Sequence, residues 1–219
     1  MARRSRASRR RRVSRLRGRY GRFVRWVVII GVLVAAAAET RQSELFYPLD
    51  QPFERSLYTH WTDADSDCQD TRTEVLIQES LEPPTLDARG CVVIAGRWYD
   101  PYTDQTFTDP SMLDVDHRVP LAEAHRSGAH RWDPARRRAF ANDLSHPDSL
   151  IAVAQGANRS KGDRDPLSWL PPAWEYRCAY TARWRATKAR WMLDDDLLEG
   201  IWIDAVLGVC RLIGQPSGP

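Results

Sequence analysis

The stretch Leu113–Pro120 reads LDVDHRVP and contains an adjacent Asp and His shortly before a proline. The alternation of apolar and polar residues over Met112–Val119 predicts a strand, which the proline ends. Asp116 and His117 therefore lie at the end of that strand. Taken alone, such a pair is more often a hydrogen-bonded structural pair than a functional one.

A second polar stretch follows an apolar segment farther along the chain. Ser149–Ala154 has the composition of a short strand, and Asn158–Asp163, which reads NRSKGD, follows at the expected start of a helix. Alone, this stretch is typical of a solvated turn. Together, the two polar stretches supply a carboxylate, an imidazole base, a neutral oxygen ligand and cations that bind phosphate.

The rest of the pattern mixes short strands with helices, which predicts an α+β fold. The motif Thr71-x-x-Glu74 is typical of a capping box and opens a helix that runs to about Glu79. Further strands are expected at 91–95 and near 106–108, the latter in a hairpin after the turn-rich segment 99–104. Helices are expected at 121–127, 135–144, 174–193 and 195–212.

Charge is distributed unevenly along the chain. Residues 1–25 hold 12 of the 32 Lys and Arg residues and no acid, so the remainder carries 20 basic against 29 acidic residues. This acidic remainder argues mildly against simple electrostatic binding of nucleic acid. The apolar run Trp26–Ala38 ends in small residues before Glu39, which is the layout of a secretory signal.

The thirteen apolar residues of that run are fewer than the roughly 20 that span a bilayer. We therefore expect residues 1–38 to be a signal peptide, or a signal-anchor if uncleaved, and the protein to be secreted or membrane-anchored outside the cytoplasm. Membrane contact is expected only through this segment. The alternative is a basic arm that binds nucleic acid, next to a core helix.

A chain of 219 residues with 42% hydrophobic content can bury one sizeable core, which excludes a fibre, a collagen or a wholly disordered protein. We expect a linker at 39–66, a folded domain at 67–212 and a flexible tail at 213–219.

The four cysteines are even in number and lack a Cys-x-x-Cys motif, which in an exported protein predicts two disulfides. Three pairings are possible. We favour Cys68 with Cys91 and Cys178 with Cys210, because each bond then closes a unit that is local in sequence. A zinc site is the alternative, but the close ligand pairs of such sites are missing.

The two polar stretches resemble the strand–strand–helix (ββα-metal) motif of HNH endonucleases, through Asp116-His117-x-x-Pro120, the strand at 149–154 and Asn158–Asp163. Over about residues 67–212 the chain also resembles exported HNH proteins with a GmrSD-type C-terminal domain. The segments that carry this wider resemblance are 70–76, 96–102, 119–124, 140–144 and 169–172. It implies a ββα-metal (His-Me finger) core with surrounding helices and two C-terminal helices.

The resemblance also implies roles for individual residues. His117 is expected to be the general base, and Asp116 with Asn158 to hold one divalent cation. These hard oxygen ligands favour Mg²⁺, and Mn²⁺ is expected to substitute. Arg159 and Lys161 are expected to bind the substrate phosphates.

Three further residues are weaker candidates in the resemblance. Arg72 is a candidate phosphate-binding residue, although an ion pair with a nearby acid explains it equally well. Asp114 is a candidate for the surrounding shell. Ser149 stands where the family commonly has Asn, so we expect it to brace the loop between the strands only in part.

The leading hypothesis is an exported, metal-dependent endonuclease that acts on nucleic acid, with DNA as the favoured substrate, little sequence specificity and a monomeric state. One alternative is a cell-wall glycosidase that uses Asp104 and Asp109. Another is a non-catalytic surface-binding module with a degenerate HNH fold. Three further groups of residues are weaker candidates. His125 and His130 could add metal ligands, and Arg126, Arg131 and Arg136–Arg138 could form a nucleic-acid face. Trp174, Trp184 and Trp191 could stack bases, although packing in the core is the simpler interpretation.

Overall fold

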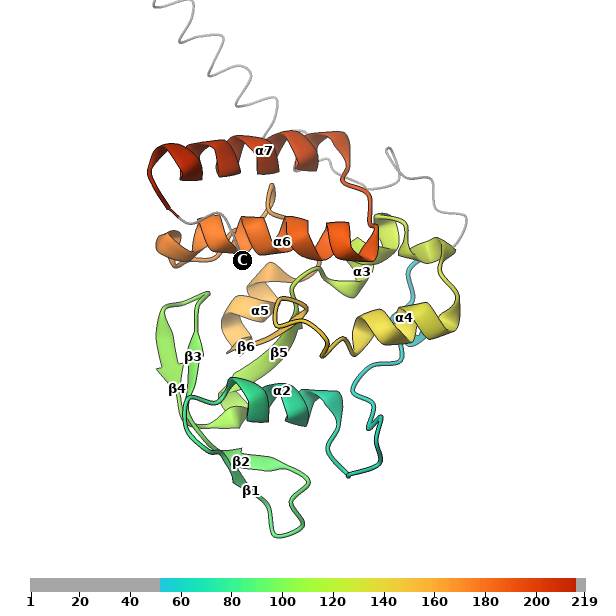
Figure 1. Cartoon of the computed structure of the whole chain (residues 1–219), viewed down its shortest axis with the longest axis vertical. Coiled ribbons are helices and arrows are strands. Elements are labelled where there is room, and N and C mark those ends of the chain that lie inside the picture. Colours follow the sequence, from blue (N-terminus) through green and yellow to red (C-terminus); the bar gives the residue numbers. More distant parts are fainter. Residues whose placement is uncertain (1–51, 216–219) are drawn as a thin grey trace, which may run out of the picture. The chain divides into compact units, whose positions relative to one another are not determined.

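The structure is a computed structural model that describes residues 52–215. The expected signal segment 1–38 lies outside these residues, as do residues 39–51 of the expected linker and 216–219 of the expected tail. The described part combines helices with three small antiparallel sheets, so the expected α+β fold is confirmed (Figure 1).

The elements follow one another closely along the chain. The helices are α2 (Thr71–Glu79), α3 (Leu121–Arg126), α4 (Pro134–Ala141), α5 (Gln155–Lys161), α6 (Arg177–Trp191) and α7 (Leu197–Leu212). The paired strands are β1 (Thr85–Leu86) with β2 (Val93–Ala95), β3 (Trp98–Asp100) with β4 (Gln105–Phe107), and β5 (Leu113–His117) with β6 (Leu150–Ala154). Single 3₁₀ turns are η2 (Arg55–Leu57), η3 (Pro110–Met112), η4 (Ala129–Arg131) and η5 (Trp174–Tyr176).

The centre of the fold is a strand–strand–helix unit. β5 and β6 pair antiparallel, with His117 opposite Leu150, and α5 follows β6 directly and contacts both strands. The connection between the strands carries α3 and α4. The unit therefore brings the end of β5 next to α5, as the sequence predicts for the two polar stretches.

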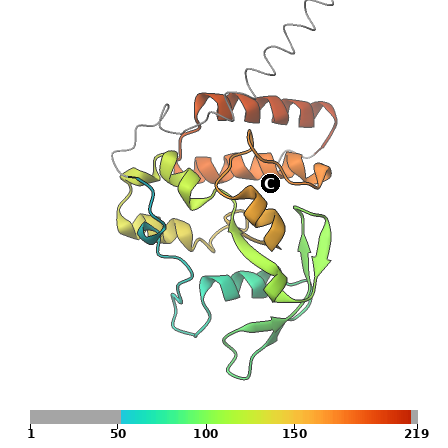
Figure 2. The ribbon, with the colours of Figure 1, turned by 180° about the vertical axis from the view of Figure 1, so that it is seen from behind.

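The strand β6 is buried along its whole length, which explains why its sequence, LIAVA, is continuously apolar. Leu150 and Ala152 belong to a core cluster that includes α2, whereas Ile151 and Val153 belong to a cluster that includes α3, α6 and α7. The two faces of one strand thus serve two cores. Figures 1 and 2 both show β5, β6 and α5 between α2 on one side and α6 with α7 on the other.

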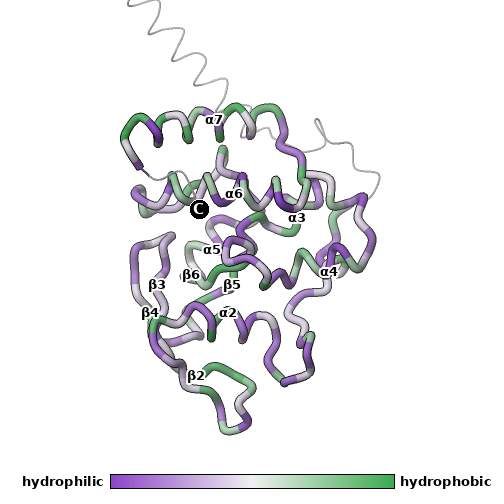
Figure 3. The backbone as a smooth tube through the Cα atoms, in the orientation of Figure 1, coloured by the Kyte–Doolittle hydropathy of each residue, from purple (hydrophilic) through white to green (hydrophobic). Residues whose placement is uncertain are grey.

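Helix α7 is amphipathic, and Figure 3 shows hydrophobic and hydrophilic segments alternating along it. Its Ile203 and Leu207 are buried, whereas Ile201 and Val209 are exposed. Its N-cap is Asp196, which forms a capping box with Glu199. The N-cap of α2 is Asp70, which accepts a hydrogen bond from Thr73 N at 2.8 Å, so the cap lies one residue before the expected Thr71.

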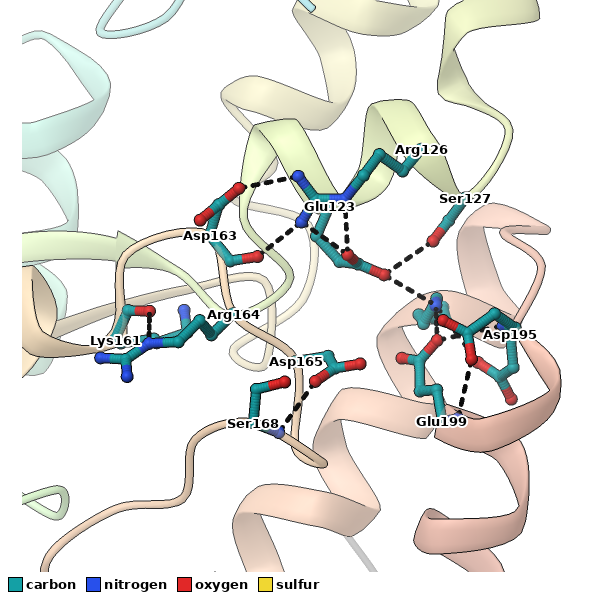
Figure 4. A network of polar contacts seen from close by, with 12 residues as sticks. Glu123, Arg126, Ser127, Lys161, Asp163, Arg164, Asp165, Ser168, Asp195 and Glu199 are labelled. Carbon is teal, nitrogen blue, oxygen red and sulfur yellow. Dashed lines mark hydrogen bonds and ion pairs between the residues drawn. The ribbon is translucent and has the colours of Figure 1, made fainter. Parts of the chain in front are cut away.

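A buried ionic network joins α3 to the two C-terminal helices. Lys188 on α6 contacts Glu199 at 2.6 Å and Glu123 at 3.4 Å, and each of these three side chains is less than 5% exposed. Figure 4 shows Glu123 also facing Arg126, which in turn reaches Asp163 at 2.7 Å after α5. The network thus ties the helix that directly follows the Asp-His strand to α6 and α7.

The structure contains both favoured disulfides, Cys68–Cys91 and Cys178–Cys210. The first joins the segment before α2 to the β1–β2 hairpin, and the second joins α6 to α7.

Replacing both Cys178 and Cys210 with serine is expected to lower the free energy of unfolding by about 2–4 kcal/mol, because the unfolded chain regains the freedom of a closed loop. Urea denaturation of the variant and the wild type, both with Cys68–Cys91 intact, measures this loss. Equal midpoints and slopes would contradict the expectation.

Residues 52–61 were expected to belong to a linker, but they pack against the domain. Tyr58 is fully buried in the core cluster and its hydroxyl bonds His125 Nδ1 at 3.0 Å. A sequence of polar and aromatic residues without periodicity does not predict that the segment packs against the domain. Within residues 52–215, no helix combines the length and apolar character needed to cross a bilayer.

Glu79, at the end of α2, has a partly buried carboxyl whose Oε2 accepts a hydrogen bond from Ala152 N at 2.8 Å. Burial raises the pKa of Glu79 to about 7, although the bond from Ala152 opposes this shift. The folded protein therefore holds a proton here between about pH 4.5 and 7 that the unfolded chain releases. In that window this group lowers the free energy of unfolding as pH rises.

Replacing Glu79 with glutamine should remove this pH dependence. We expect the variant and the wild type to have the same free energy of unfolding near pH 4. At pH 8 we expect the variant to be about 2–3 kcal/mol more stable, because the wild type then holds an ionised carboxylate in a partly buried position. Urea denaturation of both proteins from pH 4 to pH 8 tests this. A stability difference that stays constant with pH would show that Glu79 does not titrate in this range.

Candidate active site

A pocket of about 420 Å³ opens where the end of β5, helix α5 and the segment before α2 meet. Its volume lies in the range of small-ligand sites. His117, Asn158 and Arg159 line it together, so the structure brings the two predicted polar stretches to one place. The other lining residues are Phe53, Arg55, Val115, Asp116, Pro120, Leu121, Ala122, Gly162 and Asp163.

His117 is held in one orientation by its ring nitrogen and by its aromatic neighbours. Its Nε2 lies 2.9 Å from the carbonyl oxygen of Ala141, and a carbonyl can only accept, so Nε2 carries the proton. Trp61 stacks on the ring at 5.3 Å between centroids and 18° between planes, and Phe140 lies at 6.4 Å and 22°. The neutral tautomer thus leaves the lone pair on Nδ1.

Burial lowers the pKa of His117 to about 3, and the positive charges of Lys161 and Arg55 contribute to this shift. The ring is therefore neutral at physiological pH, and Nδ1 keeps its lone pair. A pKa this low also makes the imidazole a weak base, so general-base action near pH 7 requires the pKa of His117 to rise, as an anionic phosphate bound beside the ring would cause.

Asp116 forms a buried ion pair with Lys161. The lysine Nζ lies 2.8 Å from Oδ1 and 2.5 Å from Oδ2 of Asp116 and donates a third bond to the carbonyl oxygen of His117 at 2.8 Å. Tyr102 donates its hydroxyl to Asp116 Oδ2 at 2.9 Å. Lys161 is fully buried, which lowers its pKa, although Asp116 opposes the shift.

Asp116 and Lys161 therefore satisfy each other's charge and most of their hydrogen-bonding capacity. Both oxygens of Asp116 already accept hydrogen bonds, and the ammonium of Lys161 does not reach the surface. A ligand role for Asp116 and a phosphate-binding role for Lys161 therefore each require this ion pair to open. Both roles stay predictions.

Asp114 lies on the same strand as Asp116, two residues earlier, and faces the first turns of α5. Asn158 Nδ2 donates to Asp114 Oδ2 at 3.1 Å, and Arg159 Nε lies 3.8 Å from the same oxygen. The Asp114 side chain is 28% exposed and that of Arg159 is 70% exposed. Asp114 is thus the more open of the two β5 carboxylates, with Asn158 directly beside it.

Ser149 braces the turn before β6 through a polar cluster. Its Oγ donates to Asp143 Oδ2 at 2.6 Å, and Arg190 on α6 contacts both Ser149 Oγ and Asp143. Its carbonyl oxygen accepts from Arg118 N at 3.0 Å. Asp143 and Arg190 thus add the contacts that a serine in place of asparagine cannot make alone.

Several weaker candidates lie away from the pocket. Arg72 donates to the carbonyl oxygens of Pro110 and Leu113, which fixes η3 to α2. His125 is fully buried against Tyr58, and His130 bonds the carbonyl oxygen of His125. None of these three candidates lines the pocket at His117.

The arginines proposed as a nucleic-acid face are mostly engaged within the fold. Arg137 is buried and donates to the carbonyl oxygens of Ala129 and His130, and Arg126 pairs with Glu123 and Asp163. Arg131 pairs with Asp194, and Arg136 donates to the carbonyl oxygen of Trp191. Trp184 and Trp191 pack in the core as expected, whereas Trp174 is 63% exposed.

Asp104 and Asp109, the pair considered for a glycosidase, serve local structure. Asp104 accepts from the Tyr99 hydroxyl, and Asp109 caps η3. The hydrogen bonds from Ser111 lower the pKa of Asp109, whereas a glycosidase acid needs a raised pKa. The geometry does not favour that alternative.

Sequence reasoning missed the contribution of the segment before α2. Phe53 and Arg55 line the pocket, and Trp61 stacks on His117. Only the abundance of aromatic residues near His60 hinted at packing in this segment.

Residues 67–197 match the family described as the C-terminal domain of GmrSD restriction endonucleases. The chain belongs to this family. An uncharacterized secreted protein of Arthroderma benhamiae is 36% identical over 158 residues, which cover 72% of this chain and 76% of that protein. No solved structure matches the chain.

The GmrSD C-terminal domain match includes β5, β6 and α5, and hence His117 and Asn158. It assigns the chain to a family named for nucleases. Residues 52–66 and nearly all of α7 lie outside the matched region, although both pack on the matched part.

Proposed function

We propose that this GmrSD C-terminal domain protein is an endonuclease that hydrolyses phosphodiester bonds of nucleic acid, with His117 as the general base. The observation that carries the proposal is the 2.9 Å hydrogen bond from Nε2 to the carbonyl oxygen of Ala141, which leaves Nδ1 free to take a proton from the attacking water. His117 lines a pocket with Asn158 and Arg159, and the family is one of restriction endonucleases.

Arg159 is the residue of α5 that we assign to a substrate phosphate. It lines the pocket, its side chain is 70% exposed, and its guanidinium can bind two phosphate oxygens at once. Lys161 can bind phosphate only if its ion pair with Asp116 opens. We therefore assign it a structural role, which is to hold Asp116 and the end of β5 in place.

A divalent cation, which the family resemblance implies, fits the side chains beside the pocket in part. Asp114 offers a carboxylate that is 28% exposed, and Asn158, whose amide nitrogen contacts that carboxylate, carries an amide oxygen; such oxygen ligands suit Mg²⁺, or Mn²⁺ in its place. Asp116 fits only after its ion pair with Lys161 opens. When bound, such a cation stabilises the charge that develops on the phosphate oxygens.

We propose an extracytoplasmic protein, secreted or anchored through its N-terminal segment, that acts as a monomer. The two disulfides support an oxidising compartment, and the relative in Arthroderma benhamiae is described as secreted. We propose DNA as the substrate. We also propose that cleavage has little sequence specificity, because the described residues contain no recognisable module that reads a DNA groove.

Incubation of the disulfide-bonded protein with supercoiled plasmid tests the function. We expect nicking with Mg²⁺ or Mn²⁺ and none with EDTA. Isothermal titration with Mn²⁺, comparing the wild type with Asp114→Asn and Asp116→Asn, separates the two β5 carboxylates as ligands.

Folded protein that cleaves neither DNA nor RNA with either cation would overturn the proposal. A binding module would then be the remaining reading of the family fold. Cleavage of RNA alone would keep the reaction class and change the substrate.

A further inference from the structure

The segment before α2 contributes an arginine to the pocket, although it lies outside the part of the chain that matches the family. Arg55 belongs to the 3₁₀ turn η2, and its side chain is exposed and lines the pocket together with Arg159. Its charge is close enough to His117 to contribute to the lowered pKa of that ring. The Arg55 guanidinium thus lies near His117, and it comes from a segment that lies outside the family match.

Arg55 is held in place by a histidine in a defined tautomer. His60 Nδ1 lies 2.8 Å from the carbonyl oxygen of Tyr58, so Nδ1 donates and Nε2 carries the lone pair. That Nε2 accepts a hydrogen bond from Arg55 Nη2 at 3.2 Å. Tyr58 is fully buried, so the chain anchoring His60 and Arg55 is fixed to the core.

The other charges at the pocket are already paired. Asp116 pairs with Lys161, and Asp163 pairs with Arg126. Arg159 lies 3.8 Å from Asp114. Within residues 52–215, Arg55 has a histidine and no carboxylate as its polar partner. A guanidinium without a neutralising acid, preoriented beside a pocket, favours an anion.

We propose that Arg55, oriented by His60, binds a phosphate of the nucleic-acid substrate and so forms a second anchor beside Arg159. This inference rests on the proposed nuclease function. It assigns to the segment at residues 53–61 a part of the substrate-binding surface.

The test measures DNA binding separately from cleavage. A fluorescein-labelled DNA duplex is titrated in EDTA with the wild type, Arg55→Ala, Arg55→Lys and His60→Ala, by fluorescence anisotropy at several KCl concentrations. Arg89→Ala is the matched control, because Arg89 is exposed in the β1–β2 connection, lies outside the pocket and pairs with Asp87.

Arg55→Ala is expected to weaken binding about 5- to 10-fold at 0.1 M salt and to reduce the slope of log K against log salt by about one phosphate contact. Arg55→Lys should keep the slope, since the charge remains, but lose part of the affinity. His60→Ala should also keep the slope and weaken binding, because the guanidinium loses its orientation. Arg89→Ala should change neither quantity.

A positioning role on the fold alone would lower the unfolding midpoint of Arg55→Ala and leave the salt slope unchanged, and this result would overturn the inference. Wild-type cleavage of plasmid together with wild-type-like binding by Arg55→Ala would also overturn it, while leaving the nuclease function intact. A wild type that neither binds nor cleaves nucleic acid would refute both.

Discussion

Replacement of His117 with alanine is expected to lower the cleavage rate by a factor of about 10²–10⁴, the usual contribution of a positioned general base. The imidazole is held by Ala141 and stacked by Trp61, and its removal takes away the Nδ1 acceptor. The neighbouring His60 ring, 6.4 Å away between centroids, already bonds Tyr58 and Arg55 through its two nitrogens. Single-turnover cleavage of plasmid at saturating protein measures the chemical step directly. Substrate affinity should change little, because the ring does not carry charge in the free protein.

His146→Ala is the control for this replacement, because His146 is partly exposed and lies outside the pocket at His117. It should cleave at the wild-type rate. His117→Ala also removes aromatic packing, so its urea midpoint is measured in the same preparation. A folded His117→Ala protein that retains the wild-type rate would rule out His117 as the base.

Replacement of Lys161 with methionine is expected to lower the free energy of unfolding by about 3–5 kcal/mol. The change leaves the Asp116 carboxylate buried with the Tyr102 hydroxyl as its remaining hydrogen-bond donor, and the carbonyl oxygen of His117 loses a donor. The free energy of unfolding of a whole domain is about 5–15 kcal/mol, so this loss is a large fraction of the total. Urea denaturation measures the loss.

The double variant Lys161→Met with Asp116→Asn should recover part of this stability, because no unpaired charge remains in the interior. Arg159→Met is the control on the same helix. Its side chain is 70% exposed, and we expect a change within about 0.5 kcal/mol. A Lys161→Met protein with wild-type stability but weaker DNA binding would instead show that Lys161 faces the substrate.

The central unit could be predicted from the sequence because each of its parts has a local signal. Alternation marks β5, continuous apolar residues mark β6, and the polar stretch after it marks α5. The strand order and the meeting of His117 with Asn158 follow once β5 and β6 pair. The disulfides could be predicted for a similar reason, since each closes a short, local unit.

The direction of the Lys161 side chain could not be predicted in the same way. A lysine within a polar, basic stretch is typical of a solvated helix face, and its burial is possible only because Asp116 and a backbone carbonyl meet it in three dimensions. The packing of residues 52–61 is a similar case. Tyr58 finds its partner in His125, 67 residues away in sequence, and no local pattern encodes that contact.

The contacts of α7 set a limit on where the chain can be shortened. The family match ends at residue 197, the first residue of that helix. A protein cut there would keep every residue of the pocket, yet Cys178 would become a free thiol and Lys188 would lose the carboxylate of Glu199. Such a fragment would keep the Lys188–Glu123 contact to α3 but lose the core residues Ile203 and Leu207. We therefore expect the smallest stable unit to extend beyond residue 197, where the family match ends.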